Sequence, residues 1–408
     1  YPVNLLMSGP AGGVTGALWV ALQAGFPNLL TVDVGGTSTD VALIMNGVPR
    51  LRRETTIGDV TVRASSVDVR SIGAGGGSIA HVPELTKALR VGPQSAGADP
   101  GPAAYGRGGT EPTATDANVV LGYLPEMQRL GGELELKRDL SAQAVGKIAT
   151  ALGKSLHDAA LGIYDIINEN MVGALRLVSV EQGHDPRDYA LIAFGGAGPL
   201  HANALSILLG SWPSIIPPGP GVLCALGDAT TALRDESART YIRKFSETTP
   251  GEIAKTLEQL SATAAQALER EKVPLAEMKR SYQVDVRYHG QGLRLTIDVD
   301  IGALKKRGLK AISEPFDAEH KRLFTFALPL EHEFVALRAV VQGRGISVRK
   351  PAIARGDRNP KAAAIGTQLV YMDRKKIKAT VYERAKLKAG NRIRGPAIVI
   401  EMDSTTVI

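Results

Sequence analysis

LLTVDVGGTSTDVALI, residues 29–44, is the stretch of sequence that decides the fold. Its two apolar runs are short and rich in Val, Leu and Ile, and a Gly-Gly-Thr-Ser turn separates them, so the pattern predicts two strands joined by a tight turn. Just before it, SGPAGGVTGALWVALQAGFP at 8–27 carries apolar residues at helical spacing until Gly25 and Pro27. The opening of the chain is therefore predicted to be a helix followed by a strand meander.

The turn between these strands has the chemistry of a phosphate-binding loop. Glycine N–H groups and neighbouring hydroxyls can close around phosphate oxygens, and a carboxylate at a strand end can hold a hydrated Mg²⁺. The candidate nucleotide-binding residues are Asp33, Gly35, Gly36, Thr37, Ser38 and Asp40; Asp33 and Asp40 are also the candidate catalytic acids, and Asp33 is the candidate magnesium ligand through water. An ordinary polar hairpin is the alternative, and the spacing alone leaves both open.

A second glycine turn lies in FGGAGP, residues 194–199, between a hydrophobic strand and a helix. Backbone exposed at such a junction can approach a nucleotide closely, and the helix N-terminus adds partial positive charge. The candidate nucleotide-binding residues of this turn are Gly195, Gly196, Ala197, Gly198 and Pro199. The spacing differs from the GxGxxG of dinucleotide-binding folds, and the turn taken singly also fits a structural role.

Composition narrows the class of protein. The 408 residues carry a formal net charge of +7, but the basic residues are dispersed and lack interleaved aromatics, so no nucleic-acid partner is expected. A single cysteine excludes an intrachain disulfide, and without a signal peptide or an apolar run of membrane-spanning length we expect a cytoplasmic protein with no membrane contact. Because the chain begins Tyr1-Pro2-Val3, we expect it to be a piece of a longer polypeptide.

The predicted secondary structure of the chain changes near residue 279. Residues 92–118 are so rich in Gly and Pro that we expect no regular element there, and a loop this long is usually functional or disordered. Helical patterns follow up to about residue 271, and alternating strands dominate from Lys279 onward. We therefore predict an α/β domain over 1–275 and a strand-rich α+β domain over 276–408.

Seven strings taken in order carry a family resemblance that covers nearly the whole chain. They resemble the A-type subunit of N-methylhydantoinase, 5-oxoprolinase and acetone or acetophenone carboxylases. The strings are SGPAGGVTGA, DVGGTSTDVAL, IGAGGGSIA, SAGADPGPAAYGRGGTEPTATDAN, AFGGAGPLHA, RYHGQG and GPAIVIEMDSTTV. The resemblance implies an actin-like ATPase fold, in which two ribonuclease-H-like halves close on ATP and Mg²⁺.

Within that fold, the resemblance makes residues 33–40 the second phosphate loop and residues 195–199 the adenosine loop. The first phosphate loop, which the family places near its own N-terminus, is absent from this sequence. A nucleotide held by one wall of a cleft gains little of the preorganised environment that phosphoryl transfer needs, so we expect this chain alone to hydrolyse ATP poorly. The missing half belongs either to the same polypeptide or to another chain.

The resemblance also implies an activity. In the family, ATP phosphorylates the carbonyl or enolate oxygen of an amide, imide or ketone, and a B-type partner subunit carries the second step. One hypothesis is therefore the ATP-dependent ring opening of a hydantoin, 5-oxoproline or a related lactam. The alternatives are a subunit of an acetone- or acetophenone-type carboxylase and a non-catalytic scaffold.

Four further side chains are candidates for substrate contact or for support of the site. Asp68 and Arg70 lie in SVDVRSIGAGGG, Asp116 in TATDAN and His201 just after the second glycine turn. For Asp116, a helix cap or an Asx turn is as good an explanation as contact with a ligand. For His201, a local hydrogen bond is a better explanation than catalysis. Arg70 stands where the family pattern has histidine, and this departure leaves the substrate class open.

Overall fold

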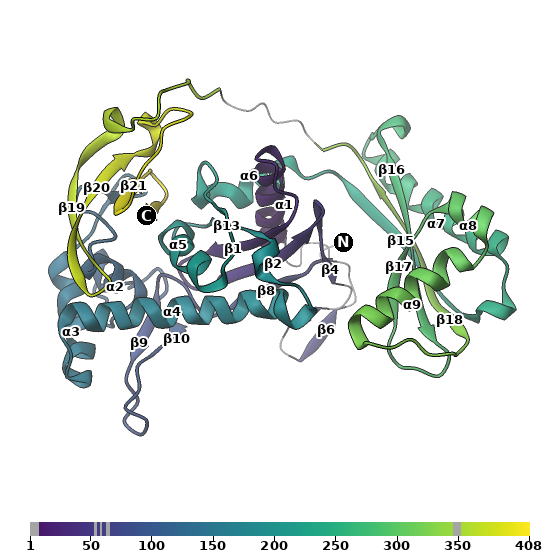
Figure 1. Cartoon of the computed structure of the whole chain (residues 1–408), viewed down its shortest axis with the longest axis horizontal. Coiled ribbons are helices and arrows are strands. Elements are labelled where there is room, and N and C mark those ends of the chain that lie inside the picture. The colour runs from purple at the N-terminus through teal and green to yellow at the C-terminus, as the bar shows by residue number, and fades with distance from the viewer. Residues whose placement is uncertain (1–7, 53–54, 58, 63–65, 346–351) are drawn as a thin grey trace. The chain divides into compact units, whose positions relative to one another are not determined.

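The computed structural model describes residues 8–52, 55–57, 59–62, 66–345 and 352–408 (Figure 1). Its backbone contacts divide the chain into two compact units. The first unit comprises Tyr1–Ala229 and Arg349–Ile408, and the second comprises Thr230–Val348. Among the described helices, none combines the length and the apolarity needed to cross a bilayer.

A mixed sheet forms the centre of the first unit. Its strands lie in the order β14 (Ser214–Ile215), β13 (Ala190–Phe194), β1 (Leu29–Val34), β2 (Thr39–Met45) and β3 (Val48–Pro49), with β8 (Val69–Ile72) also pairing with β2. β1, β13 and β14 run parallel, whereas β1, β2 and β3 form an antiparallel meander. This arrangement is that of a ribonuclease-H-like half and confirms the predicted actin-like α/β fold.

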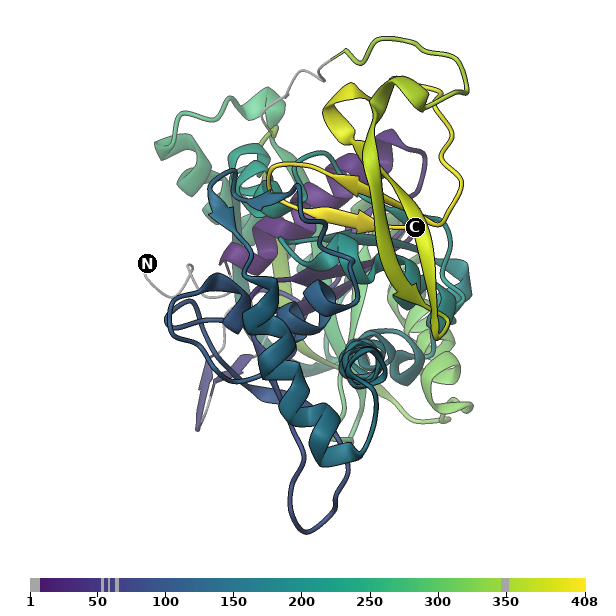
Figure 2. The same ribbon diagram turned by 90° about the vertical axis from the view of Figure 1, so that its left-hand side faces the viewer.

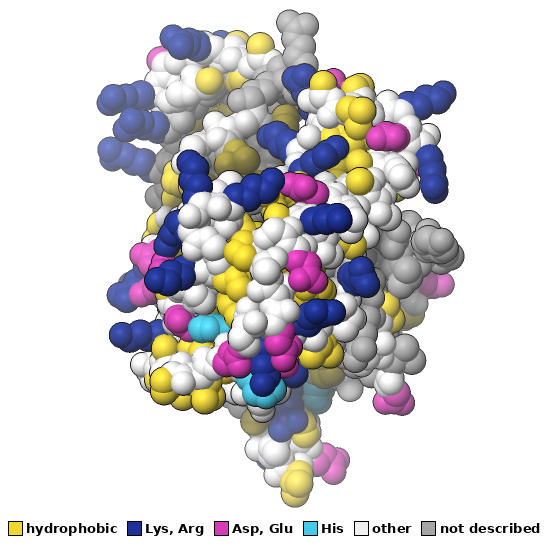
Figure 3. All heavy atoms as spheres, turned by 90° about the vertical axis from the view of Figure 1, so that its right-hand side faces the viewer, with side chains coloured by type: hydrophobic (Ala, Val, Ile, Leu, Met, Phe, Trp, Pro, Cys, Tyr) yellow, Lys and Arg dark blue, Asp and Glu magenta, His cyan; other side chains and the backbone are white. Residues whose placement is uncertain are grey.

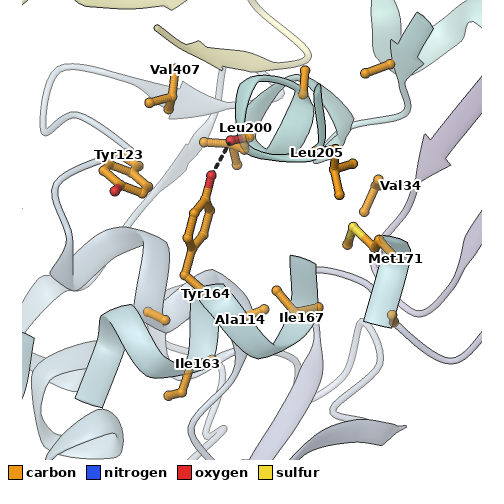
Figure 4. Packing of buried hydrophobic residues seen from close by; sticks show 14 of the residues in the cluster. Val34, Ala114, Tyr123, Ile163, Tyr164, Ile167, Met171, Leu200, Leu205 and Val407 are labelled. Carbon is orange, nitrogen blue, oxygen red and sulfur yellow. Dashed lines mark hydrogen bonds between the residues drawn. The ribbon is translucent and has the colours of Figure 1, made fainter. Parts of the chain in front are cut away.

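Helices cover both faces of this sheet because successive strand residues point to opposite sides. Leu29 and Ile44 pack with α1 (Ser8–Gln23) on one face, whereas Leu30 and Leu43 belong to the larger cluster on the other. Four helices contribute to that larger cluster: α2 (Ala114–Val120), α3 (Arg138–Leu152), α4 (Leu156–Val178) and α5 (Gly198–Leu209). Figure 4 shows Tyr164 of α4 reaching across this core to donate a hydrogen bond of 3.1 Å to the Leu200 carbonyl of α5.

The glycine- and proline-rich stretch 92–118 contains regular structure, so the expectation of none was wrong. β9 (Ser78–His81) pairs with β10 (Arg90–Ser95), and α2 begins at Ala114. Thr113 caps α2 by accepting a hydrogen bond from the Asp116 N–H. A capping box, with the helix buried against α3 and α4, outweighs the local abundance of helix breakers.

The final segment of the chain returns to the first unit as a four-stranded sheet, drawn in yellow in Figure 2. Its strands are β19 (Ala364–Met372), β20 (Lys375–Glu383), β21 (Ala397–Ile400) and β22 (Thr405–Val407), with β20 and β21 parallel. Val381, Ile398 and Val407 are buried in the same core cluster as α4 and α5. The described part of this unit also includes α6 (Leu223–Thr230) and the short pairs β4 (Leu51–Arg52) with β7 (Ser66–Val67), β5 (Thr55–Ile57) with β6 (Val60–Val62), and β11 (Arg129–Leu130) with β12 (Leu134–Glu135).

The second unit is an antiparallel sheet packed against helices. Its strands lie in the order β15 (Arg234–Lys244), β18 (His332–Gln342), β16 (Lys279–Tyr288) and β17 (Leu295–Val299). Helices α7 (Pro250–Arg270), α8 (Ile301–Arg307) and α9 (Lys310–Phe324) supply the rest of its core. Figure 3 shows the basic side chains of this side of the molecule interspersed with acidic and apolar ones.

The two units divide the chain differently from the predicted boundary between 275 and 276. β15 and α7 precede that boundary, yet both pack against β18, which follows it. The strands after residue 363 lie in the other unit, where they complete a core made by residues far earlier in the chain. The proportion of strand residues rises after residue 279, but the sequence of a strand does not indicate which sheet the strand joins.

Candidate functional site

The two glycine turns meet at one edge of the central sheet. β1 and β13 are parallel neighbours with Asp33 opposite Phe194, so both strands end at the same edge. The Ala197 N–H donates a hydrogen bond of 3.0 Å to the Val34 carbonyl. Gly195 has a φ of 77°, and a side chain there would overlap the Asp33 carboxylate. The site therefore requires glycine at this position, both for backbone conformation and for space.

Two carboxylates face each other across the first turn. Asp33 and Asp40 are opposite residues of the β1–β2 hairpin, and the Gly35 N–H closes the turn on the Ser38 carbonyl at 3.0 Å. Burial raises the pKa of Asp33, a hydrogen bond from the Cys224 thiol opposes that rise, and the charge of Asp40 adds to it. Burial likewise raises the pKa of Asp40, against a hydrogen bond from the Ser71 hydroxyl.

These two acids fit a hydrated divalent cation. Mg²⁺ usually keeps several waters and binds proteins through one or two carboxylates together with substrate phosphates. Within the described ranges, no group of three or more His, Cys, Asp or Glu side chains forms a metal cage. Desolvated carboxylates of like charge would be stabilised by a cation between the protein and a phosphate.

A third glycine tract supports the turn from the protein side. Gly76 N–H donates to the Gly35 carbonyl at 3.0 Å, and Gly77 N–H donates to the Gly36 carbonyl at 2.6 Å. A side chain at Gly75 would lie 2.8 Å from the Gly35 oxygen. The sequence identified this tract as a motif without assigning it a role, because its contact with the turn is tertiary.

Cys224 adds a contact that the sequence did not reveal. The residue lies in the apolar string VLCAL, yet its thiol is partly exposed and lies 3.1 Å from Oδ2 of Asp33. Burial and the neighbouring Asp33 raise the pKa of this thiol to about 12, so it remains a hydrogen-bond donor. Cys224 thus orients the candidate magnesium ligand from a position 191 residues further along the chain.

Asp116 is held inside the core. Its carboxylate accepts hydrogen bonds from the Ala104 N–H at 2.7 Å, the Thr113 hydroxyl at 2.7 Å and the Ser141 hydroxyl at 2.8 Å. The side chain is fully buried. In this structure Asp116 ties the start of α2 to neighbouring segments, which is the capping alternative rather than substrate contact.

His201 is fully buried in the first turn and a half of α5. Its Nδ1 lies 2.8 Å from Oδ1 of Asn168, and its ring stacks on Tyr164 with centroids 5.2 Å apart. Burial lowers the pKa of His201 to about 4, so the ring is neutral at physiological pH. His201 therefore joins α5 to α4 through contacts with Asn168 and Tyr164.

Asp68 and Arg70 flank the hairpin on its other side. β8 pairs with β2, which sets Arg70 opposite Val41 and Ser71 opposite Asp40. Asp68 forms an ion pair with Arg52, and its carboxylate lies 3.9 Å from Nε of Arg70. The structure thus places these two candidates beside β2, next to Asp40, and among the described residues no hydrogen bond or ion pair joins either side chain to the glycine turns.

Comparison with known proteins gives matches over the whole chain. The family model described as hydantoinase/oxoprolinase matches residues 1–237, and the model of the hydantoinase/oxoprolinase C-terminal domain matches residues 243–408. The alpha subunit of caprolactamase from Pseudomonas jessenii is 34% identical over all of this chain and 59% of its own length. The beta subunit of acetone carboxylase from Xanthobacter autotrophicus is 31% identical over 99% of this chain and 58% of its own length.

A solved structure agrees with these matches. The crystal structure of the ATP-dependent caprolactamase from Pseudomonas jessenii superposes with a TM-score of 0.89 at 33% identity, over 98% of this chain and 59% of that one. The chain spans about three fifths of the length of these relatives.

Proposed function

Because the chain belongs to the hydantoinase/oxoprolinase family, we propose that it is the ATP-handling part of a two-component enzyme that opens a cyclic amide, such as a lactam, a hydantoin or 5-oxoproline. The observation that carries this proposal is the meeting of the two glycine turns at Asp33 and Gly195. One turn offers N–H groups and hydroxyls to phosphates, and the other offers exposed backbone at a helix start to the nucleoside.

The proposed chemistry follows from the inertness of amides. Resonance makes an amide carbonyl a poor electrophile, and phosphorylation of its oxygen removes that resonance. Asp33 and Asp40 would hold Mg²⁺ through water, and Mg²⁺ when bound neutralises charge on the phosphates. ADP is the product of the phosphoryl transfer. Water then adds to the activated carbon, the ring C–N bond breaks with the nitrogen leaving as an amine, and inorganic phosphate is released, in a step that we assign to a B-type partner subunit. A further segment, in the same polypeptide or in another subunit, would complete the nucleotide cleft; the greater length of the relatives supports this.

A ketone carboxylase subunit is the second candidate function. Subunits of acetone carboxylase and acetophenone carboxylase are 31% and 32% identical to this chain, close to the 34% of the caprolactamase subunit. The same nucleotide site would then transfer the γ-phosphoryl group of ATP to an enolate oxygen, with ADP as product. That phosphoryl group would pass to bicarbonate, and the enolate carbon would bond to the bicarbonate carbon as inorganic phosphate leaves.

Substrate-stimulated ATP turnover separates these functions. The complete gene product, purified with its partner subunit, is assayed with Mg²⁺-ATP and either caprolactam, hydantoin or 5-oxoproline, or else acetone or acetophenone with bicarbonate. We expect a cyclic amide to stimulate turnover and the ketones to have no effect. Stimulation only by a ketone with bicarbonate would replace our proposal with the carboxylase. No affinity for Mg²⁺-ATP by calorimetry would reduce the chain to a scaffold.

A further inference from the structure

We infer that the turn Glu401–Ser404, between β21 and β22, forms part of the nucleoside side of the nucleotide site, and that Asp403 is a positioning residue for that side. The inference rests on the proposed nucleotide site. It gives a role to the string EMDSTTV, which the sequence marked only as part of a motif.

A chain of contacts joins Asp403 to the second glycine turn. Oδ2 of Asp403 accepts a hydrogen bond of 2.8 Å from the Gly221 N–H, across 182 residues of sequence. The adjacent Pro220 carbonyl accepts a hydrogen bond of 2.9 Å from the Gly195 N–H. Gly195 in turn lies against Asp33. The loop 219–221 therefore lies between the carboxylate of Asp403 and the turn that we assign to the nucleoside.

The backbone of the same turn reaches the site directly. A side chain at Gly196 would lie 3.8 Å from the Asp403 carbonyl oxygen. At Gly221, a side chain would lie 3.0 Å from Cβ of Asp403. The absence of a side chain at Gly196 and at Gly221 therefore allows the Glu401–Ser404 turn to lie close to the second glycine turn and to the loop 219–221.

Other groups hold the Glu401–Ser404 turn without help from the Asp403 side chain. Nε2 of the buried Gln128 donates to the Ser404 carbonyl at 3.1 Å, and the Gly131 N–H donates to the Met402 carbonyl at 3.2 Å. Because the turn is fixed in this way, the Asp403 carboxylate is free to act outward, on the loop 219–221. Its removal should leave the turn in place.

Charge and position together assign Asp403 to the nucleoside rather than to the phosphates. A carboxylate without a cation repels the polyphosphate of ATP, whereas Asp33 and Asp40 would face it through Mg²⁺. Along the sheet edge, the contacts run from the phosphate turn through Gly195 and Pro220 to Gly221 and Asp403. A nucleotide whose phosphates lie at residues 35–38 would thus meet the Asp403 side at its sugar and base.

The test compares two ligands that share the three phosphates, of which only one carries a nucleoside. Binding of fluorescent N-methylanthraniloyl-ATP and of inorganic tripolyphosphate, each with Mg²⁺, is measured on the complete gene product with its partner. We expect Asp403→Ala to raise the Kd for the ATP analogue about tenfold, because a charge-assisted hydrogen bond is lost, and to change the Kd for tripolyphosphate less than about twofold. Asp403→Asn keeps an acceptor oxygen and should restore most of the affinity.

Two further variants keep the test decisive. Asp373→Asn removes a charge from the β19–β20 turn of the same sheet and should change neither Kd. Gly221→Ala pushes the loop away from Asp403 from the other side and should raise the Kd for the ATP analogue as Asp403→Ala does. It therefore tests the inference even if Asp403→Ala folds poorly. Equal weakening of both ligands, or no weakening of the ATP analogue, would overturn the inference alone. Wild-type protein that binds no ATP analogue would overturn the proposed function as well.

Discussion

Asp33 and Asp40 are the residues on which the proposed chemistry depends. They are opposite each other in the β1–β2 hairpin, and burial raises the pKa of both. Burying a carboxylate costs free energy unless a partner compensates for it, and among the residues that the structure describes neither acid accepts a hydrogen bond from a basic side chain. Residues whose burial costs free energy without stabilising the fold are typical of functional sites.

Replacing either acid should therefore abolish turnover without unfolding the protein. We expect Asp33→Asn and Asp40→Asn each to lower kcat for substrate-stimulated ATP hydrolysis by about 100-fold or more. The melting temperature should stay the same or rise, because the amide removes a buried charge. Asp188→Asn, at an exposed position before β13, is the matched control with unchanged kcat. Full activity in either site variant would remove these acids from the mechanism.

His201 contributes a pH dependence to stability. Its pKa is about 4 in the folded protein and about 6.5 when unfolded, so the unfolded chain binds the extra proton more readily. The stabilisation by neutral His201 is thus complete above pH 6.5 and is lost as the pH falls toward 4, by roughly 3 kcal/mol over that range. The raised pKa values of Asp33 and Asp40 act with the opposite sign, so only a difference between variants is informative.

Urea unfolding of wild type and of His201→Asn between pH 7 and pH 4 measures that difference. We expect the variant to be less stable than wild type at pH 7 and to lose less stability on acidification. Parallel pH profiles for the two proteins would show that His201 does not titrate as its burial implies.

At the scale of elements, the crossing of α1 and α6 explains several glycines of the string SGPAGGVTGA. A side chain at Gly227 would overlap the Gly12 carbonyl, and one at Gly13 would lie 2.9 Å from the Cys224 sulfur. The two helices therefore approach each other through backbone, and this close approach brings Cys224 to Asp33. The glycines of α1 therefore permit its close packing against α6.

Substitutions to alanine at two helical glycines should have opposite effects. Gly227→Ala forces α6 away from α1 and should lower the free energy of unfolding by about 1–3 kcal/mol. Gly9→Ala in α1 meets nothing within 4 Å and should be neutral or stabilising by up to about 1 kcal/mol. Chemical denaturation of both variants provides the measurement. A neutral Gly227→Ala would contradict the close crossing.

At the scale of the whole molecule, the second unit has its own core. Leu257 of α7, Val284 of β16, Phe316 of α9 and Leu337 of β18 are all fully buried in one cluster. Every strand of its sheet pairs within the unit. Such a unit contains what independent folding requires.

We expect residues 230–348 expressed alone to unfold in a single cooperative transition, monitored by circular dichroism in urea. The same segment cut at the boundary inferred from sequence, residues 276–348, lacks β15 and α7 and should not unfold cooperatively. Equal cooperativity of the two fragments would show that β15 and α7 are dispensable for this fold.

The sequence by itself determined the elements and the chemistry of the turns. Short apolar runs rich in Val, Leu and Ile predicted β1 and β2, helical spacing predicted α1, and the glycines and hydroxyls of residues 33–40 predicted a phosphate loop. These signals are local, because strand period, helix period and turn conformation depend on neighbours within a few residues. The order of seven motifs was enough to indicate the family and hence the actin-like fold.

Only the tertiary structure decided which distant residues meet. The parallel pairing of β1 with β13 brings Gly195 to Asp33, and packing places Cys224 and Asp403 beside them. It also buried Asp116 in a cap and returned the last four strands to the first unit. No short-range pattern encodes these contacts, since they join residues more than 150 positions apart or depend on which surface a strand covers.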